Sequence, residues 1–588
     1  MIYVTILGLL ACLFWSVRTT PCLHKSEGLA KLTLPWGTWE ATKYDEDRDI
    51  YVFRNVRFGK APVDDLRFAA PQYPEPIANK YQVQDSSYGP KCIQADVSKE
   101  AFPEPVANGT ESEDCLFLDV YVPSWALELD PNDEKLAVVV WIYGGAYVFG
   151  AKNTTIELKT GNFSAYDGKS IFDSSQGSLI WVTGNYRLGA YGFLAGSTME
   201  GGGQPNAGLH DQRLLLDWVQ KYIGQIGGDK DSVNMWGLSA GGGSIVHHLT
   251  AYGGKKDQKP LFKRAAIWSA AFQWAYDRKQ TLEQTFLNFT QAAGCPRDAS
   301  KALECLRKVA KDSDEMKKAN QQIVTQQLAL GMFPFGPAVD GDLVPELPAS
   351  LLAKVSHDYD EASLFLAKWV DTKDDFTKFL ALAFPGQQLQ EIRKSIEDKY
   401  PPVAFDFHQT TRMRQVLRDS TFVCNKQQVY SAYKNSSKVY AIRYDMLPAQ
   451  HGSDLLAVVW NYEADVSDLI RALIPSIPDW MPPIFESFWA YFVYKYQRYF
   501  ASHALTGDPN YLALGDDLQW EVTIDDGDKL VNSMKAGLLY RSGQTQFYTL
   551  GQDAQTSVEA CDFWTGIAKQ IAKMQTGSLI LNAQNVEL

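Results

Sequence analysis

Five apolar, β-rich segments along the chain constrain its fold more than any other feature. They span residues 136–143, 177–186, 232–237, 263–269 and 438–444. Residues 209–223, which precede the third segment, place apolar side chains at helical spacing. Continuous apolar strands that alternate with helices are typical of a mostly parallel sheet with helices on both faces. The sequence therefore predicts an α/β fold, in which ligands bind at the carboxyl ends of the strands.

Two charge-rich segments do not fit a simple sheet. Residues 281–330 and 363–420 are helix-like, and we expect them to form a cap over the sheet. The aromatic stretch 481–506 has helical spacing and is interpreted as a packed helix. Because no repeat, low-complexity block or long linker separates modules, residues 26–588 are expected to form one large domain.

The net charge excludes two classes of partner. It is -13 at pH 7, whereas nucleic acids and anionic membranes bind basic protein faces. The apolar stretch 2–17 is shorter than the roughly 20 residues that a spanning helix needs. We interpret residues 1–20 as a signal peptide, cleaved between residues 17 and 25, with an uncleaved anchor as the alternative. No later segment is apolar enough to span a membrane, so a secreted chain is expected.

The cysteines and sequons agree with secretion. Of eight cysteines, six lie beyond the leader and its cut, with no Cys-x-x-Cys pair, which favours disulfides over zinc but leaves their pairing open. These six are Cys92, Cys115, Cys295, Cys305, Cys424 and Cys561. The N-glycosylation sequons begin at Asn108, Asn153, Asn162, Asn288 and Asn435.

The stretch 235–245, MWGLSAGGGSI, sets Ser239 between glycines at the end of the third apolar segment. A helix-compatible segment follows, so that strand, sharp turn and helix succeed one another. Gly237 and Gly241 occupy positions where a side chain would collide with neighbouring backbone, as in the nucleophile elbow Gly-x-Ser-x-Gly. A phosphate-binding loop would end in Gly-Lys-Ser/Thr, and this segment contains no lysine. By itself the motif also fits a glycine-rich packing turn. A catalytic role for Ser239 therefore depends on whether the sequence also supplies a base and an acid.

A serine nucleophile needs a base, and the base needs an acid that orients it. In this arrangement the acid and then the histidine follow the serine along the chain. His247 and His248 lie on the helix that leaves the elbow and are expected to face away from the hydroxyl. His451 follows a strong strand in the glycine-containing loop QHGSD, so it is the predicted base. The residues alone leave three acids open: Asp358, Asp360 and Glu361.

Acyl transfer also needs backbone amides that stabilise an oxyanion. One amide belongs to the residue after the nucleophile, and the others belong to a glycine-rich loop after an earlier strand. The stretch VVVWIYGGAYVFG supplies such a loop. The predicted donors are the amides of Gly145, Ala146 and Ala240.

With these motifs, the chain resembles the type-B carboxylesterase/lipase family of α/β-hydrolases, and most closely its fungal secreted branch. The matching stretches cover residues 66–71, 112–123, 141–150, 185–194, 206–219, 237–242, 450–455 and 506–510. The resemblance implies an α/β-hydrolase fold and hydrolysis of a small-molecule ester without metal or cofactor. It implies Ser239 as nucleophile, His451 as base and Glu361 as acid. It also implies the disulfides Cys92–Cys115, Cys295–Cys305 and Cys424–Cys561.

The chain departs from the family pattern at several positions. Leu238 stands where many members have Glu, Ala146 replaces a glycine of the oxyanion loop, and the segment before Glu361 is short. The first disulfide loop, residues 93–114, is acidic and lacks an amphipathic stripe. We therefore expect an esterase for soluble or small esters rather than an interfacial lipase. An enzyme dedicated to one secondary metabolite and a non-catalytic binding module are the remaining alternatives.

Overall fold

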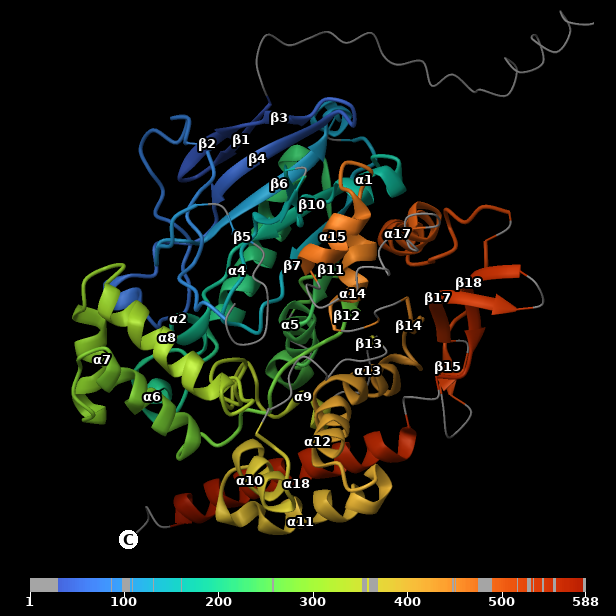
Figure 1. Ribbon diagram of the computed structural model, residues 1–588. Helices are drawn as coiled ribbons and strands as arrows, with labels where there is room; N and C mark the ends of the chain where they lie inside the picture. Colours follow the sequence, from blue (N-terminus) through green and yellow to red (C-terminus); the bar gives the residue numbers. More distant parts are fainter. Residues whose placement is uncertain are drawn as a thin grey trace, which may run out of the picture.

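The computed structural model places a seven-stranded sheet at the centre of the described part of the chain, in the order β12-β11-β7-β10-β6-β4-β3 (Figure 1). The model describes residues 30–584 except 86, 98–105, 108, 131, 160, 256–258, 352–356, 359–368, 447–448, 450, 474–488, 516, 526–529, 532, 542–543 and 554–556. The strands are β3 (Thr42–Asp45), β4 (Ile50–Arg57), β6 (Phe117–Pro123), β7 (Leu136–Ile142), β10 (Leu179–Gly184), β11 (Gly228–Leu238) and β12 (Arg264–Trp268).

The predicted α/β architecture is confirmed, and its sheet is mixed. Four of the five predicted segments form β7, β10, β11 and β12, which pair in parallel. The strands β6, β4 and β3 extend the sheet with antiparallel pairings. β3 and β4 are joined by a short hairpin, and such a connection requires antiparallel strands. The sheet is therefore parallel only on one side.

A cluster of tryptophans packs four adjacent strands together. Trp141 of β7 lies 5.8 Å from Trp181 of β10 and 5.9 Å from Trp268 of β12, measured between ring centroids. Trp236 of β11 contacts Trp181 and Trp268 at 5.8 and 5.4 Å. All four side chains are buried. Burial of such large rings contributes strongly to the core, which explains the continuous apolar pattern of these strands.

The segment 438–444 lies outside the central sheet in the described residues. It forms β14 (Ile442–Tyr444), which pairs in parallel with β13 (His357–Asp358) and with β17 (Ser533–Arg541). β18 (Gln544–Gly551) completes this second sheet. The apolar pattern of the segment correctly indicated a strand, but it contained no information about which sheet the strand joins.

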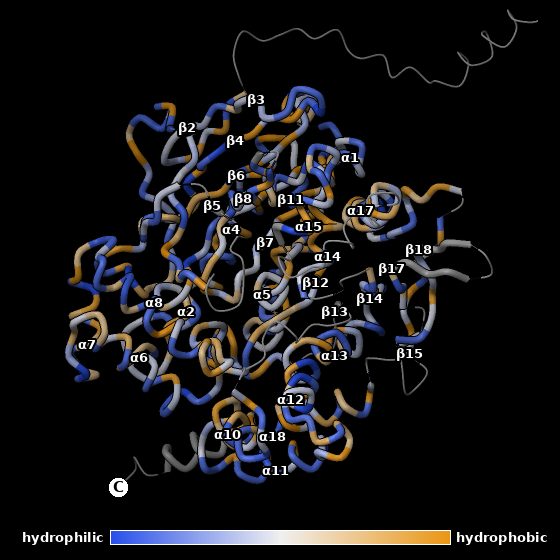
Figure 2. The backbone as a smooth tube through the Cα atoms, in the orientation of Figure 1, coloured by the Kyte–Doolittle hydropathy of each residue, from blue (hydrophilic) through white to orange (hydrophobic). Residues whose placement is uncertain are grey.

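Two groups of helices correspond to the predicted cap (Figure 1). The first is α6 (Thr281–Ala292), α7 (Ala299–Lys308) and α8 (Asp314–Leu328). The second is α10 (Lys373–Ala383), α11 (Gln390–Lys399) and α12 (Gln409–Leu417), which Figure 1 shows beside α18 (Val558–Gln584). Figure 2 shows hydrophilic and hydrophobic residues alternating along these helices, as expected where one face is buried.

Three other helices match sequence expectations or carry the site. α4 (Ala207–Tyr222) corresponds to the helical pattern at 209–223, and α17 (Trp489–Thr506) to the described part of the aromatic stretch. α5 (Ala240–Leu249) follows the elbow. No helix in the described residues is long and apolar enough to span a membrane.

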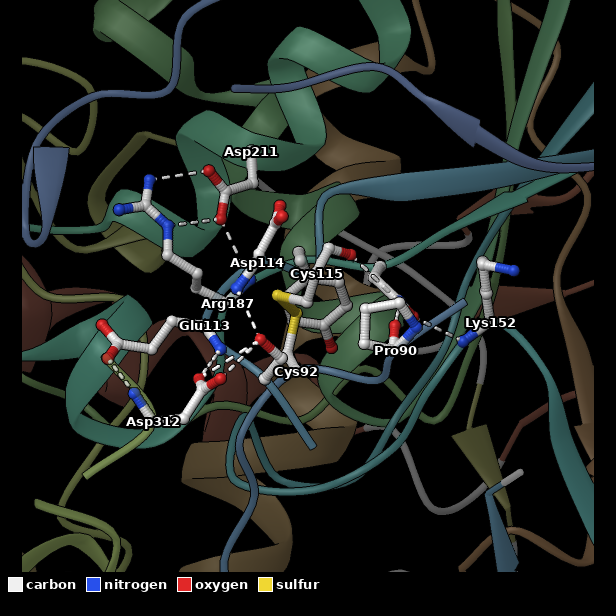
Figure 3. Close-up of a disulfide and its surroundings, with 12 residues drawn as sticks. Pro90, Cys92, Glu113, Asp114, Cys115, Lys152, Arg187, Asp211 and Asp312 are labelled. Carbon is white, nitrogen blue, oxygen red and sulfur yellow. Dashed lines mark hydrogen bonds and ion pairs between the residues drawn. A yellow bond between two sulfur atoms is a disulfide. The ribbon is translucent and has the colours of Figure 1, made fainter. Parts of the chain in front are cut away.

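The six cysteines form the three disulfides that the resemblance implies. They are Cys92–Cys115, Cys295–Cys305 and Cys424–Cys561. Figure 3 shows the first disulfide within a polar network, in which Asp312 accepts the Glu113 amide at 2.6 Å. The Glu113 carboxylate in turn pairs with the buried Arg67 at 2.6 Å. Polar contacts therefore join the chain beside this disulfide to the segment between α7 and α8.

The expected glycan at Asn153 does not fit the structure, because only 5% of the residue is exposed. Asn162 and Asn435 are exposed, and Asn288 is half-buried. Asn108 and the expected signal peptide over residues 1–20 lie outside the described residues. Occupancy of the sequons and cleavage of the leader stay predictions.

Candidate active site

Ser239 occupies the sharp turn between β11 and α5. Its backbone angles are φ 55° and ψ −123°, a conformation that non-glycine residues rarely adopt and that costs about 1–3 kcal/mol. The Ser239 amide donates to the carbonyl of Trp268 at 3.0 Å. The Ser239 carbonyl accepts the amides of Gly243 at 2.8 Å and Ala271 at 3.0 Å. Three backbone hydrogen bonds thus stabilise the strained turn.

Two glycines let the helix approach the sheet closely at this turn. A Cβ atom at Gly241 would lie 2.0 Å from the carbonyl oxygen of Ile142. A Cβ atom at Gly237 would lie 2.7 Å from the carbonyl carbon of Gly241. Both distances are too short for any side chain, so the steric reason predicted for the Gly-x-Ser-x-Gly pattern holds in the structure.

His451 reaches the serine from a distant part of the chain. Its Nε2 atom lies 2.9 Å from Ser239 Oγ, within hydrogen-bond distance. The histidine lies in the loop between β14 and α14 (Ser453–Val459). Its ring packs edge-to-face against Phe422, with 5.1 Å between the ring centroids. This geometry is the one that general-base activation of a serine requires.

The loop after β7 presents backbone amides near the elbow. Gly145 and Ala146 have φ angles of 116° and 52°. The Gly145 carbonyl accepts the amides of Val148 and Phe149 at 2.9 and 3.1 Å, which closes the loop into a tight turn. Within the described residues, the amides of Gly145 and Ala146 donate to no backbone carbonyl. Ala240 begins α5, so its amide belongs to the positive end of the helix dipole.

Ser239 lines a cavity that is predominantly apolar. The cavity has an empty volume of about 840 Å³, part of which is open to solvent. Aromatic side chains dominate its walls: Tyr147, Phe272, Trp274, Phe333, Phe335, Phe379, Phe384 and Phe422. No charged residue is among the described residues that line it. Burial raises the pKa of the Tyr147 phenol well above its ordinary value, so this side chain is also neutral. We refer to this space as the active-site cavity.

Comparison with known proteins identifies the family. The model of the carboxylesterase family matches residues 31–554. The chain belongs to this family. The chain is 33% identical to "Secreted lipase" of Arthroderma benhamiae, with 95% of this chain and 96% of that protein aligned. It is 30% identical to "Lipase 2" of Geotrichum candidum, with 82% and 87% aligned.

"Carboxylesterase patB" of Penicillium expansum is also 30% identical to this carboxylesterase, with 73% and 82% aligned. Among solved structures, Aspergillus niger EstA superposes with a TM-score of 0.69 at 23% identity, covering 93% of this chain and 99% of that chain. A PNB esterase superposes with a TM-score of 0.65 at 24% identity, covering 91% and 99%. The protein is therefore a carboxylic ester hydrolase with the α/β-hydrolase fold.

Of the three predicted acids of the carboxylesterase, only Asp358 lies within the described residues. Asp360 and Glu361 lie outside the described residues. The preceding strand β13 runs parallel to β14, with Asp358 opposite Tyr444. Because parallel strands end at the same edge of a sheet, the chain leaves β13 at the edge from which the His451 loop also departs. This register agrees with an acid shortly after Asp358.

Sequence reasoning missed a buried polar pair beside the carboxylesterase's serine and histidine. Ser269 directly follows Trp268, whose carbonyl holds the Ser239 amide. The Ser269 hydroxyl donates to Asp454 Oδ2 at 3.3 Å, and the two residues are 0% and 1% exposed. Asp454 lies on α14, three residues after His451. A His-x-x-Asp spacing at a helix start was the only signal of this pair in the sequence.

Proposed function

We propose that the protein is a secreted serine carboxylesterase that works through an acyl-enzyme. The observation that carries this proposal is the 2.9 Å distance between Ser239 Oγ and His451 Nε2 at a nucleophile elbow. The secretory location is supported by the leader-like residues 2–17, three disulfides and relatives named as secreted lipases. Residues 26–588 are proposed to act as one domain.

In the first half of the reaction, Ser239 Oγ attacks the ester carbonyl carbon while its proton passes to His451 Nε2. The carbonyl oxygen becomes an oxyanion, for which the amides of Gly145, Ala146 and Ala240 are the proposed donors. The bond to the alcohol oxygen then breaks, and that oxygen takes the proton from His451. The acyl group remains bonded to Ser239.

In the second half, His451 takes a proton from water as the water oxygen attacks the acyl carbon. The bond to Ser239 Oγ breaks, the proton returns to the serine, and a carboxylic acid leaves. Glu361 is the proposed acid that orients the imidazole, supported by the register of β13 and β14. The proposed mechanism uses neither metal nor cofactor.

The lining of the active-site cavity supports neutral esters with an apolar substituent as substrates. Its described walls contain many aromatic side chains and no charge. A charged substituent would lose its hydration there without gaining a partner. A small polar ester would in turn leave the apolar walls uncovered.

A lipase is the second candidate, because "Secreted lipase" of Arthroderma benhamiae aligns over 95% of this chain. Hydrolysis that increases sharply once triglyceride forms an emulsion would favour it over the esterase. Saturation by dissolved esters, with no increase at an emulsion, supports the esterase.

Labelling with a fluorophosphonate probe tests the proposed mechanism. We expect the wild type to bind one equivalent covalently, and Ser239→Ala to bind none. The rate at which Ser239→Ala hydrolyses a 4-nitrophenyl ester should fall to about 10³–10⁴ times the uncatalysed rate in water. This residual rate is what substrate binding and the oxyanion hole alone provide. Ser420→Ala, which also alters a serine of the active-site cavity, is the control and should keep its label. A folded wild type that binds no probe would instead indicate a non-catalytic binding module.

A further inference from the structure

A second cavity adjoins the active-site cavity. This outer cavity has an empty volume of about 760 Å³, again partly open to solvent. It lies among α6, the end of α8 and the end of α10, lined by Thr281, Leu282, Thr285, Gln327 and Leu382. None of these five residues lines the active-site cavity. The outer cavity therefore extends beyond the active-site cavity toward the helices of the cap.

The two cavities share one wall. The residues that line both are Gln273, Trp274, Met332, Phe333, Phe335 and Ala383. The wall consists of the chain after β12 and the loop after α8, with the last residue of α10 beside them. The wall contains no strand and, apart from Ala383, no helical residue. The two cavities are therefore separated by loop residues and their side chains, and not by a strand or a complete helix.

Gln273 connects the two loops of this wall. Its Oε1 atom accepts the Phe333 amide at 2.8 Å, and its Nε2 atom donates to Met332 Sδ at 3.4 Å. The second contact is weak, because thioether sulfur is a poor acceptor. The side chain is only half-buried. One good hydrogen bond thus joins the loops at this position, and the net contribution of such a bond to stability is small.

The outer cavity is chemically suited to continue an apolar chain. Trp274 and Phe335 of the shared wall are accompanied there by Phe193, Leu282 and Leu382. Asp277 is the charged residue among those that line it, and its other polar residues include Tyr276 as well as threonines and glutamines. An alkyl chain that passes the wall would therefore remain in contact with apolar atoms.

We propose that the outer cavity is an extension of the substrate site and that Gln273 sets the length of alkyl chain that the enzyme accepts. With Gln273 bonded to Phe333, the active-site cavity ends at the shared wall and short chains fit. Longer chains must displace the Gln273 side chain to enter the outer cavity. This inference rests on the proposed function, since it assigns the extension to the substrate of Ser239.

Chain-length profiles of Gln273→Ala test this inference. We expect kcat/KM for decanoyl relative to butanoyl 4-nitrophenyl esters to rise on the order of tenfold, because the longer chain no longer has to displace the Gln273 side chain and break its hydrogen bond to the Phe333 amide. Gln273→Glu keeps an acceptor for the Phe333 amide and should keep the wild-type ratio. A parallel series of acetate esters with butyl and decyl alcohols identifies which side of the ester extends. An unchanged ratio in both series would overturn the inference.

A blocking variant distinguishes entry into the outer cavity from general loosening. Thr285 lines only the outer cavity, so Thr285→Trp added to Gln273→Ala should cancel the gain for decanoyl esters and leave butanoyl esters unchanged. Retention of the long-chain gain in this double variant would contradict entry into the outer cavity.

Binding to catalytically inactive protein separates this inference from the proposed mechanism. The measured quantity is the dissociation constant of 2-butanone divided by that of 2-decanone, in proteins that carry Ser239→Ala. This ratio should be on the order of tenfold higher with Gln273→Ala than with Gln273. Hydrolysis by the wild type tests the mechanism, whereas this binding ratio tests the extension even if no ester is hydrolysed. An equal ratio with and without Gln273 would overturn the extension while leaving the mechanism intact.

Discussion

At the scale of single residues, two apolar side chains stand close to the nucleophile at positions where the sequence departs from the family pattern. Leu238, where many family members have Glu, is buried directly before Ser239. Ala146 keeps the backbone amide of the glycine that it replaces, and its methyl group helps line the active-site cavity. Both departures therefore make the vicinity of the nucleophile more apolar, which agrees with neutral ester substrates.

Three substitutions, each of which replaces a carboxylate by an amide, test which residue is the catalytic acid. Glu361→Gln should lower kcat by about 10⁴-fold, because an amide cannot hold the imidazole in the required tautomer. Asp358→Asn and Asp360→Asn should retain most of the activity, measured with the same 4-nitrophenyl ester. The reverse ranking would assign the acid to one of the aspartates.

His247 should make the stability of the fold depend on pH. Burial lowers the pKa of its imidazole to about 4, and the residue is 2% exposed. The unfolded chain binds a proton near its ordinary pKa of about 6.5, which the folded chain does not bind until about pH 4. Stability therefore falls as pH falls through this window, by up to about 3 kcal/mol.

His247→Phe should reduce this dependence, and its ring can keep the contact with Phe272. Part of the dependence should remain, because burial also lowers the pKa of His210, His248 and His503. The measurement is the free energy of unfolding in urea at pH 5 and pH 7. His408→Phe, at an exposed position, should leave the difference between the two pH values unchanged. An equal pH dependence in both variants would show that His247 does not bind the proton.

At the scale of elements, the base is positioned by helices as well as by its own loop. Phe422, which contacts the His451 ring, lies on the π-helical turn η8 (Arg418–Val423). Cys424, which directly follows η8, joins α13 (Cys424–Tyr433) to α18 through its disulfide with Cys561. The imidazole thus packs against a turn that runs directly into a helix covalently linked to α18.

Removal of this disulfide should affect stability and catalysis together. The bond closes a loop of 137 residues, so the chain-entropy model predicts that Cys424→Ala with Cys561→Ala loses about 5 kcal/mol. A loosened Phe422 should also lower kcat, measured below the unfolding transition. The control is Cys295→Ala with Cys305→Ala, which opens a 10-residue loop and should lose about 3 kcal/mol with unchanged kcat. Equal kcat values in the two double variants would contradict a link from the disulfide to His451.

At the scale of the whole molecule, surface exposure should determine where a secreted chain carries glycans. Glycopeptide mapping of protein from a eukaryotic secretory host should find Asn162 and Asn435 occupied and Asn153 unmodified, because Asn153 is buried. Ser437→Ala removes the Asn435 sequon and should lower the mass by one glycan. A glycan at Asn153 would require a different fold around that residue.

Much of the fold and the centre of the candidate site could be predicted from local patterns. β7, β10, β11 and β12 were visible as apolar runs, since strands buried on both faces have no polar face. The antiparallel side of the sheet was not predicted, because Asp119 interrupts the apolar pattern of the buried strand β6, and β3 and β4 contain several polar residues. β14 was predicted as a strand but not as part of a second sheet, because pairing partners are distant in sequence.

The sequence by itself determined the turn at Ser239, since a strand-like segment, the pattern Gly-x-Ser-x-Gly and a helix-compatible segment follow one another directly. It also indicated His451, because a glycine-containing loop after a strand is where the fold presents a base. Only the tertiary structure decided the contacts between segments far apart in the chain: the Ser269–Asp454 pair, the burial of Asn153 and the wall that Gln273 completes between two cavities. The physical reason is that steric and periodic constraints act over a few residues, whereas burial and cavity shape depend on the packing of the entire chain.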